Sequence, residues 1–181
     1  LPDWSVYALL QVWSTEADAD AFFADSELFA RYRKNTSERW TLFMKNVAAK
    51  GLWGGESPFE SSAESVDGDQ RFAVITRATI KPARLLDFWR FVPRSQEPLS
   101  EAKGLLFTKG IGEVPIMQMA TFSLWESSEA MKDFAYKSPP HREAIAKTRE
   151  LDWYREELFS RFRVYRSDGS WNGADPVAAK F

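Results

Sequence analysis

The 181-residue sequence contains no cysteine and only one histidine, His141. The absence of cysteine excludes disulfides, thiolate metal ligands, a cysteine nucleophile and a cysteine-ligated haem. A zinc site needs three or four protein ligands, which one histidine without cysteine does not supply. A Ser-His-Asp triad would need the same histidine, and no nucleophile elbow is present. The sequence therefore points away from zinc enzymes and from hydrolases of the triad type.

Long apolar runs and charge clusters are also absent. No stretch approaches the roughly 20 apolar residues that span a bilayer, and no signal peptide is visible. The 24 basic and 26 acidic residues give a net charge of −2, and neither sign forms a long block. Nucleic-acid binding requires a clustered basic surface, so no nucleic-acid partner is expected. We expect a cytoplasmic protein, with membrane association left open.

Aromatic residues are abundant: 14 Phe, 8 Trp and 5 Tyr make up 15% of the chain. Folding at this length buries roughly 70% of the surface of the extended chain, so one domain with a sizeable core is expected. Aromatic side chains serve core packing first, and in this number they can also line a large apolar cavity.

A distant internal repeat organises the chain. Each copy begins with a β-rich run that ends in tryptophan, continues with residues suited to cap helices, and returns as an apolar strand. We predict one domain, residues 1–181, built of two related halves at approximately 1–70 and 71–181. The copies are marked by Val6–Trp13 and Trp53–Gly55 in the first, and by Met119–Trp125 and Trp171–Gly173 in the second.

The order of elements predicts the fold class. Pro82 precedes a helix candidate over Ala83–Phe91, and Gly110–Glu113 is expected to be a turn. Strands and helices in two related halves predict an α+β fold, with two ferredoxin-like halves in which helices cover one face of an antiparallel sheet. The uncovered faces would meet in a barrel-like core. The expected strands are Val6–Trp13, Trp40–Val47, Arg71–Ile80, Leu105–Lys109, Met119–Trp125 and Leu158–Tyr165.

His141 is the candidate ligand for a metal. It follows Ser138–Pro140, which is typical of a helix start, and it shares the less polar stripe of that helix with Ala144 and Ile145. The N-terminal end of a helix disfavours the imidazolium form, so a neutral ring able to bind a metal is expected. A structural histidine, packed or partly exposed, is the more common alternative.

Haem is the metal group that a single histidine can hold. Its porphyrin supplies four ligands to the iron, one proximal imidazole supplies the fifth, and the opposite position stays open to oxygen. The propionates would need cations, and a solvated face or an ordinary ion pair is the common alternative for each cation. The candidate strand cations are Arg77, Lys109, Arg161 and Arg163.

Six stretches are distributed along most of the chain, in the order Trp4–Trp13, Thr76–Lys81, Lys109–Pro115, Ala120–Trp125, Pro140–Ile145 and Trp153–Phe162. Together they resemble the spheroidene monooxygenase (carotenoid ketolase) family. The resemblance implies a dimeric α+β-barrel fold and a haem cofactor. His141 matches the histidine of the family's Pro-His block and is the expected proximal ligand. Arg77 and Lys109 lie in matching blocks and are our candidates for propionate contact. The family also carries an additional strand before the part that aligns here. If the protein lacks that strand, one sheet edge is expected to be open or completed by a partner.

The leading hypothesis is a haem-dependent monooxygenase that hydroxylates an acyclic carotenoid, or a similar apolar substrate, and then forms a ketone. O₂ would be the co-substrate. Electrons would come from an external donor protein such as a ferredoxin, because no flavin or nicotinamide motif is present. A homo-oligomer and peripheral membrane contact are the other expected associations. Two alternatives remain: a haem carrier, sensor or peroxidase-like protein, and a cofactor-free α+β-barrel ligand-binding module.

Overall fold

The computed structural model describes residues 5–59, 70–90, 99, 102–114, 116–137 and 150–178. His141 and the helix predicted after Ser138 lie outside the described residues. The 3₁₀ turn η1 (Pro82–Arg84) continues as an α-helix over 85–90. The elements are α1 (Glu16–Asp25), α2 (Glu27–Asn35), β1 (Trp40–Gly51), β2 (Phe72–Ile80), η1 (Pro82–Arg84), β3 (Leu105–Val114), β4 (Gln118–Trp125), α4 (Ser128–Lys137) and β5 (Tyr154–Gly169).

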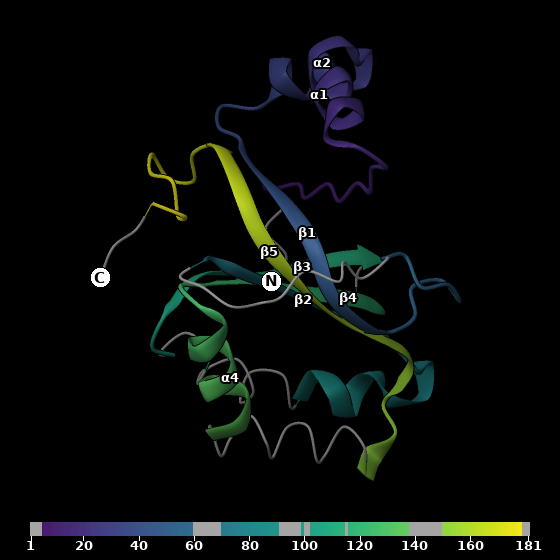
Figure 1. Cartoon of the computed structure of the whole chain (residues 1–181). Helices are drawn as coiled ribbons and strands as arrows, with labels where there is room; N and C mark the ends of the chain where they lie inside the picture. Colours follow the sequence, from purple (N-terminus) through teal and green to yellow (C-terminus); the bar gives the residue numbers. More distant parts are fainter. Residues whose placement is uncertain are drawn as a thin grey trace. The chain divides into compact units, whose positions relative to one another are not determined.

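The five strands form one sheet in the order β1-β5-β2-β4-β3. β2 is a central strand that pairs antiparallel with β4 on one side and with β5 on the other, and β3 pairs antiparallel with β4 (Figure 1). An antiparallel sheet accompanied by helices confirms the predicted α+β class. The dimer stays a prediction.

Local sequence explains where the elements begin. β2 is rich in β-branched residues, which favour the extended chain in the middle of a sheet. The Thr15 hydroxyl accepts a hydrogen bond from the Asp18 amide at 3.2 Å and caps α1. Ser26 caps α2 in the same way through the Phe29 amide at 3.3 Å. These caps satisfy amides that have no partner inside the helix.

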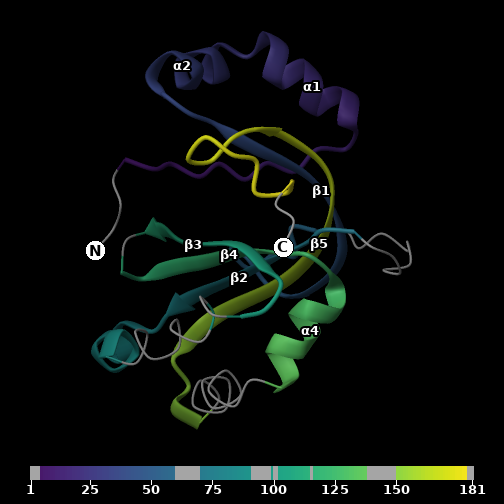
Figure 2. The same ribbon diagram turned by 90° about the vertical axis from the view of Figure 1, so that its left-hand side faces the viewer.

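One face of the sheet packs against α4. Phe72 and Val74 of β2 form a buried cluster with Trp125 of β4 and Met131 of α4. Figure 2 shows α4 beside the sheet, with β2, β4 and β3 adjacent to one another. Because alternate strand residues point to opposite faces, the side chains of Ala73, Ile75 and Arg77 emerge on the other face. This alternation separates the two candidate surfaces described below.

The chain divides into two compact units, Leu1–Leu42 with Ser167–Phe181, and Phe43–Arg166. β1 and β5 each contribute residues to both units. In the first unit, α1 and α2 join through Phe23 and Phe29, whose ring centroids lie 4.6 Å apart. The predicted halves, 1–70 and 71–181, stay a prediction, and the compact units are divided at other positions.

Two local predictions are wrong. The run Val6–Trp13 is not a strand, because it forms no ladder with any of the described strands. A β-prone run without a neighbouring strand cannot satisfy its backbone through a ladder, and here Tyr7 is exposed. Gly110–Glu113 is not a turn, because β3 continues through it and Gly110 pairs with Thr121. Cross-strand pairing therefore outweighs the turn preference of the glycines. Among the described helices, none has the length and apolar character needed to cross a membrane.

Candidate functional site

The predicted site residues divide between the two faces of the sheet and the undescribed part of the chain. His141 lies outside the described residues. Arg77 of β2 and Lys109 of β3 both emerge on the face opposite α4. Arg77 is three positions after Val74, so its side chain points to the other face. Lys109 pairs with Phe122, which is also the partner of Ile75, so Lys109 shares the face of Ile75 and Arg77. The structure thus places two of the three predicted residues on one surface.

Arg77 is the centre of a charged network on that surface. Its side chain is 2% exposed, although arginine is rarely buried without partners. Nε donates to Glu113 Oε2 at 2.7 Å, and one terminal nitrogen donates to Glu156 Oε1 at 2.7 Å. The guanidinium carbon also lies 4.7 Å from the ring centroid of Trp53. Two carboxylates and an aromatic face therefore compensate the burial of this charge.

The network continues into a tight turn after β1. Trp53 and Glu56 exchange backbone hydrogen bonds, and the amides of Gly54 and Gly55 donate to the Glu156 carboxylate at 2.9 and 2.7 Å. The two glycines have φ of +66° and +85°, as a type I′ turn requires. Hydrogen bonds from these amides, followed by Arg77, hold the pKa of Glu156 below its usual value. Glu156 therefore stays ionised near neutral pH and ties the turn to β2.

Lys109 and Arg77 do not form one anion site. Arg77 pairs with Ala120 on β4, whereas Lys109 pairs with Phe122, so the two cations lie two strands and one side-chain row apart. Strand spacing and rise place their Cα atoms roughly 12 Å apart. Because Arg77 already pairs with two carboxylates, contact with a third anion would have to compete with Glu113 and Glu156. Lys109 is half-buried.

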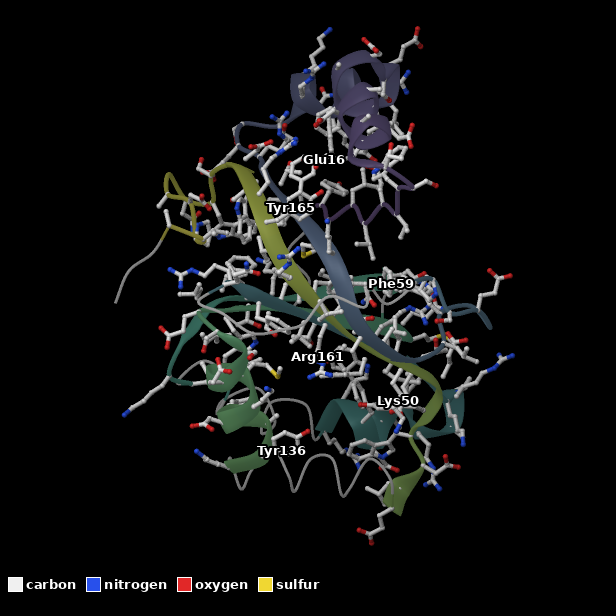
Figure 3. The ribbon with its side chains drawn as sticks, in the orientation of Figure 1. Glu16, Lys50, Phe59, Tyr136, Arg161 and Tyr165 are labelled. Atoms are coloured by element: carbon white, nitrogen blue, oxygen red, sulfur yellow. The ribbon has the colours of Figure 1, made fainter. Side chains whose placement is uncertain are left out.

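The face that α4 covers carries a second set of candidates. Arg161 of β5 pairs with Val74, and Phe159 pairs with Thr76, so all four side chains emerge on that face. Figure 3 shows Arg161 on the side of the sheet where α4 lies. Phe59 packs on the other face, against Phe162, which pairs with Ala73. Thr76 is the one exposed residue of β2, and Phe159 is exposed beside it. The cover of this face is therefore incomplete next to Arg161.

Arg161 presents a buried donor whose hydrogen-bonding capacity is unused. Within the part of the chain that the structure describes, its Nε atom is buried and has no hydrogen-bond partner. A buried guanidinium nitrogen of this kind is costly unless an acceptor completes it, and a carboxylate is its preferred acceptor. Arg163, one side-chain row along the same face, donates to Gln70 at 3.3 Å. This face can hold an anion beside an apolar ring, Phe159.

A cluster of protein ligands for a free metal ion is not found in the described ranges. No group of three or more histidine, aspartate or glutamate side chains is placed there to hold a metal. Carboxylates near the Arg77 network are committed to that arginine and to the Trp53 turn.

Sequence reasoning missed the partners of Arg77. It places Glu113 in a turn, and it treats Glu156 and Trp53 only as parts of longer segments. One signal could have found them: Glu38 and Glu156 are separated by the same 118 positions as Trp53 and Trp171. A carboxylate that repeats in register with a Trp-turn predicts a contact between the two. The buried Nε of Arg161 had no sequence signal, because strand alternation gives the face on which a side chain emerges and not the acceptors that it meets there.

Comparison with known proteins identifies the relatives of this chain. No family model matches the sequence. A crystal structure from Fusobacterium nucleatum, described as a candidate monooxygenase, shares the fold with a TM-score of 0.52 and 11% identity, over 87% of this chain and 68% of that one. Spheroidene monooxygenase of Cereibacter sphaeroides is 36% identical over 97% of this chain, which spans 54% of that protein. Spheroidene monooxygenase of Rhodobacter capsulatus is 40% identical over 181 residues, 99% of this chain and 75% of that protein. The chain therefore belongs to the spheroidene monooxygenase family, a family of oxidoreductases.

Proposed function

We propose that this protein is a haem-dependent monooxygenase that inserts oxygen into an acyclic carotenoid of the spheroidene type. The observation that carries the proposal is the 40% identity with a spheroidene monooxygenase along nearly the whole chain. The abundance of aromatic residues, 15% of the chain, suits an apolar polyene substrate. Haem is proposed because the chain has one histidine and no cysteine, and haem needs a single axial imidazole.

The described residues fit a haem on the face of the sheet that α4 covers. The buried Arg161 Nε, which has no partner among the described residues, matches the need of a propionate for a cation. Phe159 and Thr76 lie exposed on the same face, where a flat apolar ring needs room and an apolar wall. His141 is the proposed axial ligand, because its Pro-His block resembles the one that contains a histidine in the spheroidene monooxygenase family. Haem on the opposite face, with Arg77 and Lys109 as propionate contacts, is the competing arrangement.

The chemistry divides between the cofactor and the chain. Haem, when bound, supplies the redox chemistry that activates O₂ for insertion into a C–H bond. The balanced reaction consumes one O₂, two electrons and two protons, and gives an alcohol and water, so an external electron donor is part of the proposal. Arg161 neutralises and orients a propionate. Phe159 offers an apolar contact to the ring or to the substrate, and Thr76 offers a hydroxyl that can hold or pass a proton at its Oγ.

Haem titration of the purified protein, followed by absorption spectra, tests the cofactor. A Soret band that saturates at one haem per chain, and that shifts on reduction and with carbon monoxide, is expected. His141→Ala should abolish stoichiometric uptake, while circular dichroism of the haem-free protein stays unchanged. A protein that remains colourless, or a variant that binds haem as well as the wild type, would overturn the haem assignment.

Arginine variants decide between the two faces. Arg161→Leu should weaken haem binding about tenfold, as loss of one charge-assisted contact implies, and Lys109→Leu should leave it within about twofold. The reverse result would place the cofactor on the face of Arg77. Lys109→Leu is the matched control, because it also removes a strand cation of the same domain.

Substrate conversion tests the reaction itself. The haem-loaded protein, supplied with spheroidene in detergent and a chemical or ferredoxin reductant, should give a product heavier by one oxygen atom. Incorporation of label from ¹⁸O₂, and not from labelled water, identifies O₂ as the source. Haem binding without any oxygenated product would favour a carrier or sensor of haem, and neither haem nor substrate binding would favour an interaction module.

A further inference from the structure

The turn between β3 and β4 contains a backbone conformation that its sequence does not favour. Ile116 has φ of +77°, in the left-handed region that glycine and asparagine occupy readily. A β-branched side chain is costly there, because its Cβ crowds the neighbouring carbonyl. The side chain gains no burial in return, since it is 56% exposed. Folding alone therefore does not explain isoleucine at this position.

The helix after β2 holds that turn in place and extends its apolar surface. The Trp89 indole N–H donates to the Ile116 carbonyl at 3.1 Å, and both residues belong to the same compact unit. Leu86 lies one helical turn before Trp89 and is 75% exposed, and Val114 at the end of β3 is exposed as well. In Figure 2 the helix and the free end of the β3–β4 hairpin project on the left of the view. We call Leu86, Trp89, Val114 and Ile116 the apolar tip.

Charged side chains flank the apolar tip. Lys81, Arg84 and Arg90 lie on the segment that carries Leu86 and Trp89. Two carboxylates pair with these cations: Asp87 lies 4.0 Å from Arg84, and Asp152 pairs with Lys81. These five side chains together carry one excess positive charge, in a chain whose net charge is −2. Long cationic side chains beside exposed Leu, Trp and Ile are typical of interfacial membrane segments, where the cations reach the headgroups and the indole sits at the boundary.

We propose that the apolar tip inserts into the headgroup boundary of a lipid bilayer that contains anionic lipid. This inference extends the proposed function, because an acyclic carotenoid resides in the apolar interior of membranes. Ile116 and Leu86 enter the acyl boundary, Trp89 anchors at the interface with its N–H satisfied by Ile116, and Arg90 contacts the headgroups. The apolar contribution dominates, since only one positive charge is in excess.

Vesicle flotation of the purified, haem-free protein tests the surface without using the oxygenase reaction. The wild type should float with phosphatidylcholine–phosphatidylglycerol vesicles. The double variant Leu86→Asp with Ile116→Asp should bind about tenfold more weakly, since two apolar insertions are replaced by charges. Tyr136→Asp is the matched control, because Tyr136 is 74% exposed on α4, away from the tip, and receives the same charge (Figure 3). The control should change binding by less than about twofold.

Two further results separate lipid binding from self-association and from a general effect of added charge. High salt, or omission of phosphatidylglycerol, should weaken binding about fivefold at most, as one excess charge allows. Ile116→Asn replaces the apolar side chain by a polar one that suits a positive φ. This variant should keep or raise the melting temperature while it lowers vesicle binding. A wild type that stays in solution, equal losses for Tyr136→Asp, or self-association abolished by the tip variants would each overturn the proposal.

Failure of this proposal is distinguishable from failure of the proposed function. Conversion of spheroidene supplied in detergent does not require a bilayer, and vesicle flotation requires neither haem nor substrate. The double tip variant should therefore keep its activity on detergent-dispersed spheroidene and lose most of its activity on spheroidene held in vesicles. Equal losses in both assays would show that the tip contributes to the reaction rather than to membrane docking.

Discussion

Two turns of this molecule have the same construction and different surroundings. The first follows β1 and comprises Gly51–Glu56, and the second follows β5 and comprises Gly169–Ala174. In each, tryptophan and the residue three positions later exchange backbone hydrogen bonds around two residues of positive φ. In each, one glutamate accepts both turn amides: Glu156 in the first turn and Glu38 in the second. Every one of these residues has its counterpart 118 positions along the chain.

The difference between the turns lies in what else the glutamate contacts. Glu156 pairs with the buried Arg77, which also lies against the ring of Trp53. Glu38 instead accepts a hydrogen bond from the Ser170 hydroxyl at 2.7 Å. Position 170 corresponds to Leu52 in the first turn, where no hydroxyl is available. The shared glutamate therefore belongs to the repeat, and the arginine network is an addition in one copy.

This comparison bears on the role of Arg77. A cation kept only to hold a cofactor would leave donors open toward that cofactor. Arg77 instead meets Glu113, Glu156 and Trp53, and so links β2, β3, β5 and the first turn. We infer that the main contribution of Arg77 is to the stability of the fold.

The largest effect is expected where the two turns are identical. A Cβ at Gly51 would lie 2.0 Å from the carbonyl oxygen of Glu157, and one at Gly169 would lie 2.1 Å from that of Arg39. Both glycines also have positive φ, +101° and +90°. Gly51→Ala and Gly169→Ala should each lower the free energy of unfolding by about 4 kcal/mol, measured by urea denaturation. Gly54→Ala, with nothing within 4 Å of its Cβ, should cost only about 1 kcal/mol.

Unequal losses of unfolding free energy for Gly51→Ala and Gly169→Ala would show that the two turns differ in how rigidly they are held. If Gly169→Ala were as mild as Gly54→Ala, the second turn would tolerate rearrangement, and the repeat would be one of sequence rather than of stability.

Arg77→Leu tests the feature that only the first turn has. Loss of the guanidinium leaves Glu113 and Glu156 without their cation and removes the contact with Trp53. The cost should be about 3 kcal/mol, at the low end for a broken buried pair because both carboxylates keep some access to water. Arg84→Leu is the control, since its pair with Asp87 is exposed and 4.0 Å long, and it should stay within about 0.5 kcal/mol. A small loss for Arg77→Leu, together with weakened haem uptake, would instead make Arg77 a cofactor contact.

The sequence predicted most of the strands better than it predicted the contacts of their side chains. β2 follows from a run rich in β-branched residues. The Trp-Gly-Gly and Trp-Asn-Gly segments have the composition of type I′ turns, although in the sequence they served only to mark the ends of the two copies. Val6–Trp13 has the same composition as a strand, but strand formation depends on a partner that a local pattern does not encode. The alternation of β2 already implies in the sequence that Arg77 shares a face with Ile75, as the pairing of β2 with β4 shows. Its pairing with Glu113, 36 positions away, depends on the β3–β4 register, which no local signal fixes.

The two glutamates should respond to acid in the same direction and by different amounts. The pKa of Glu38 is held below its usual value by the amide of Gly173, the Ser170 hydroxyl and the amide of Asn172. The pKa of Glu156 is lowered by the two turn amides and then by Arg77. A lowered native pKa means that the stabilisation is present above the usual glutamate value, near 4.5, and is lost as the pH falls through the native value.

Glu156→Gln should therefore destabilise the protein at neutral pH, by less than Arg77→Leu, and the difference from wild type should shrink as the pH falls below the usual glutamate value. Glu38→Gln should show the same pH dependence with a smaller amplitude, since it breaks no ion pair. Urea unfolding at about pH 7 and about pH 3 measures both differences. A difference that persists unchanged in acid would show that the carboxylate charge is not what stabilises the turn.

Exchange of the turn residues should have the smallest effect and a predictable sign. Gly54 and Asn172 occupy equivalent positions with φ of +66° and +54°, which asparagine tolerates better than other residues with a Cβ. Gly54→Asn should stabilise by up to about 0.5 kcal/mol, because asparagine loses less backbone freedom on folding, and Asn172→Gly should destabilise by a similar amount. Gly54→Val, which cannot adopt this φ without strain, should cost about 2 kcal/mol in the same urea measurement.

Opposite signs for the two exchanges would mean that the turns share one backbone and differ only in what surrounds them. Two losses of equal size would mean that each turn is fitted to its own residue, because a common backbone cannot make both exchanges unfavourable.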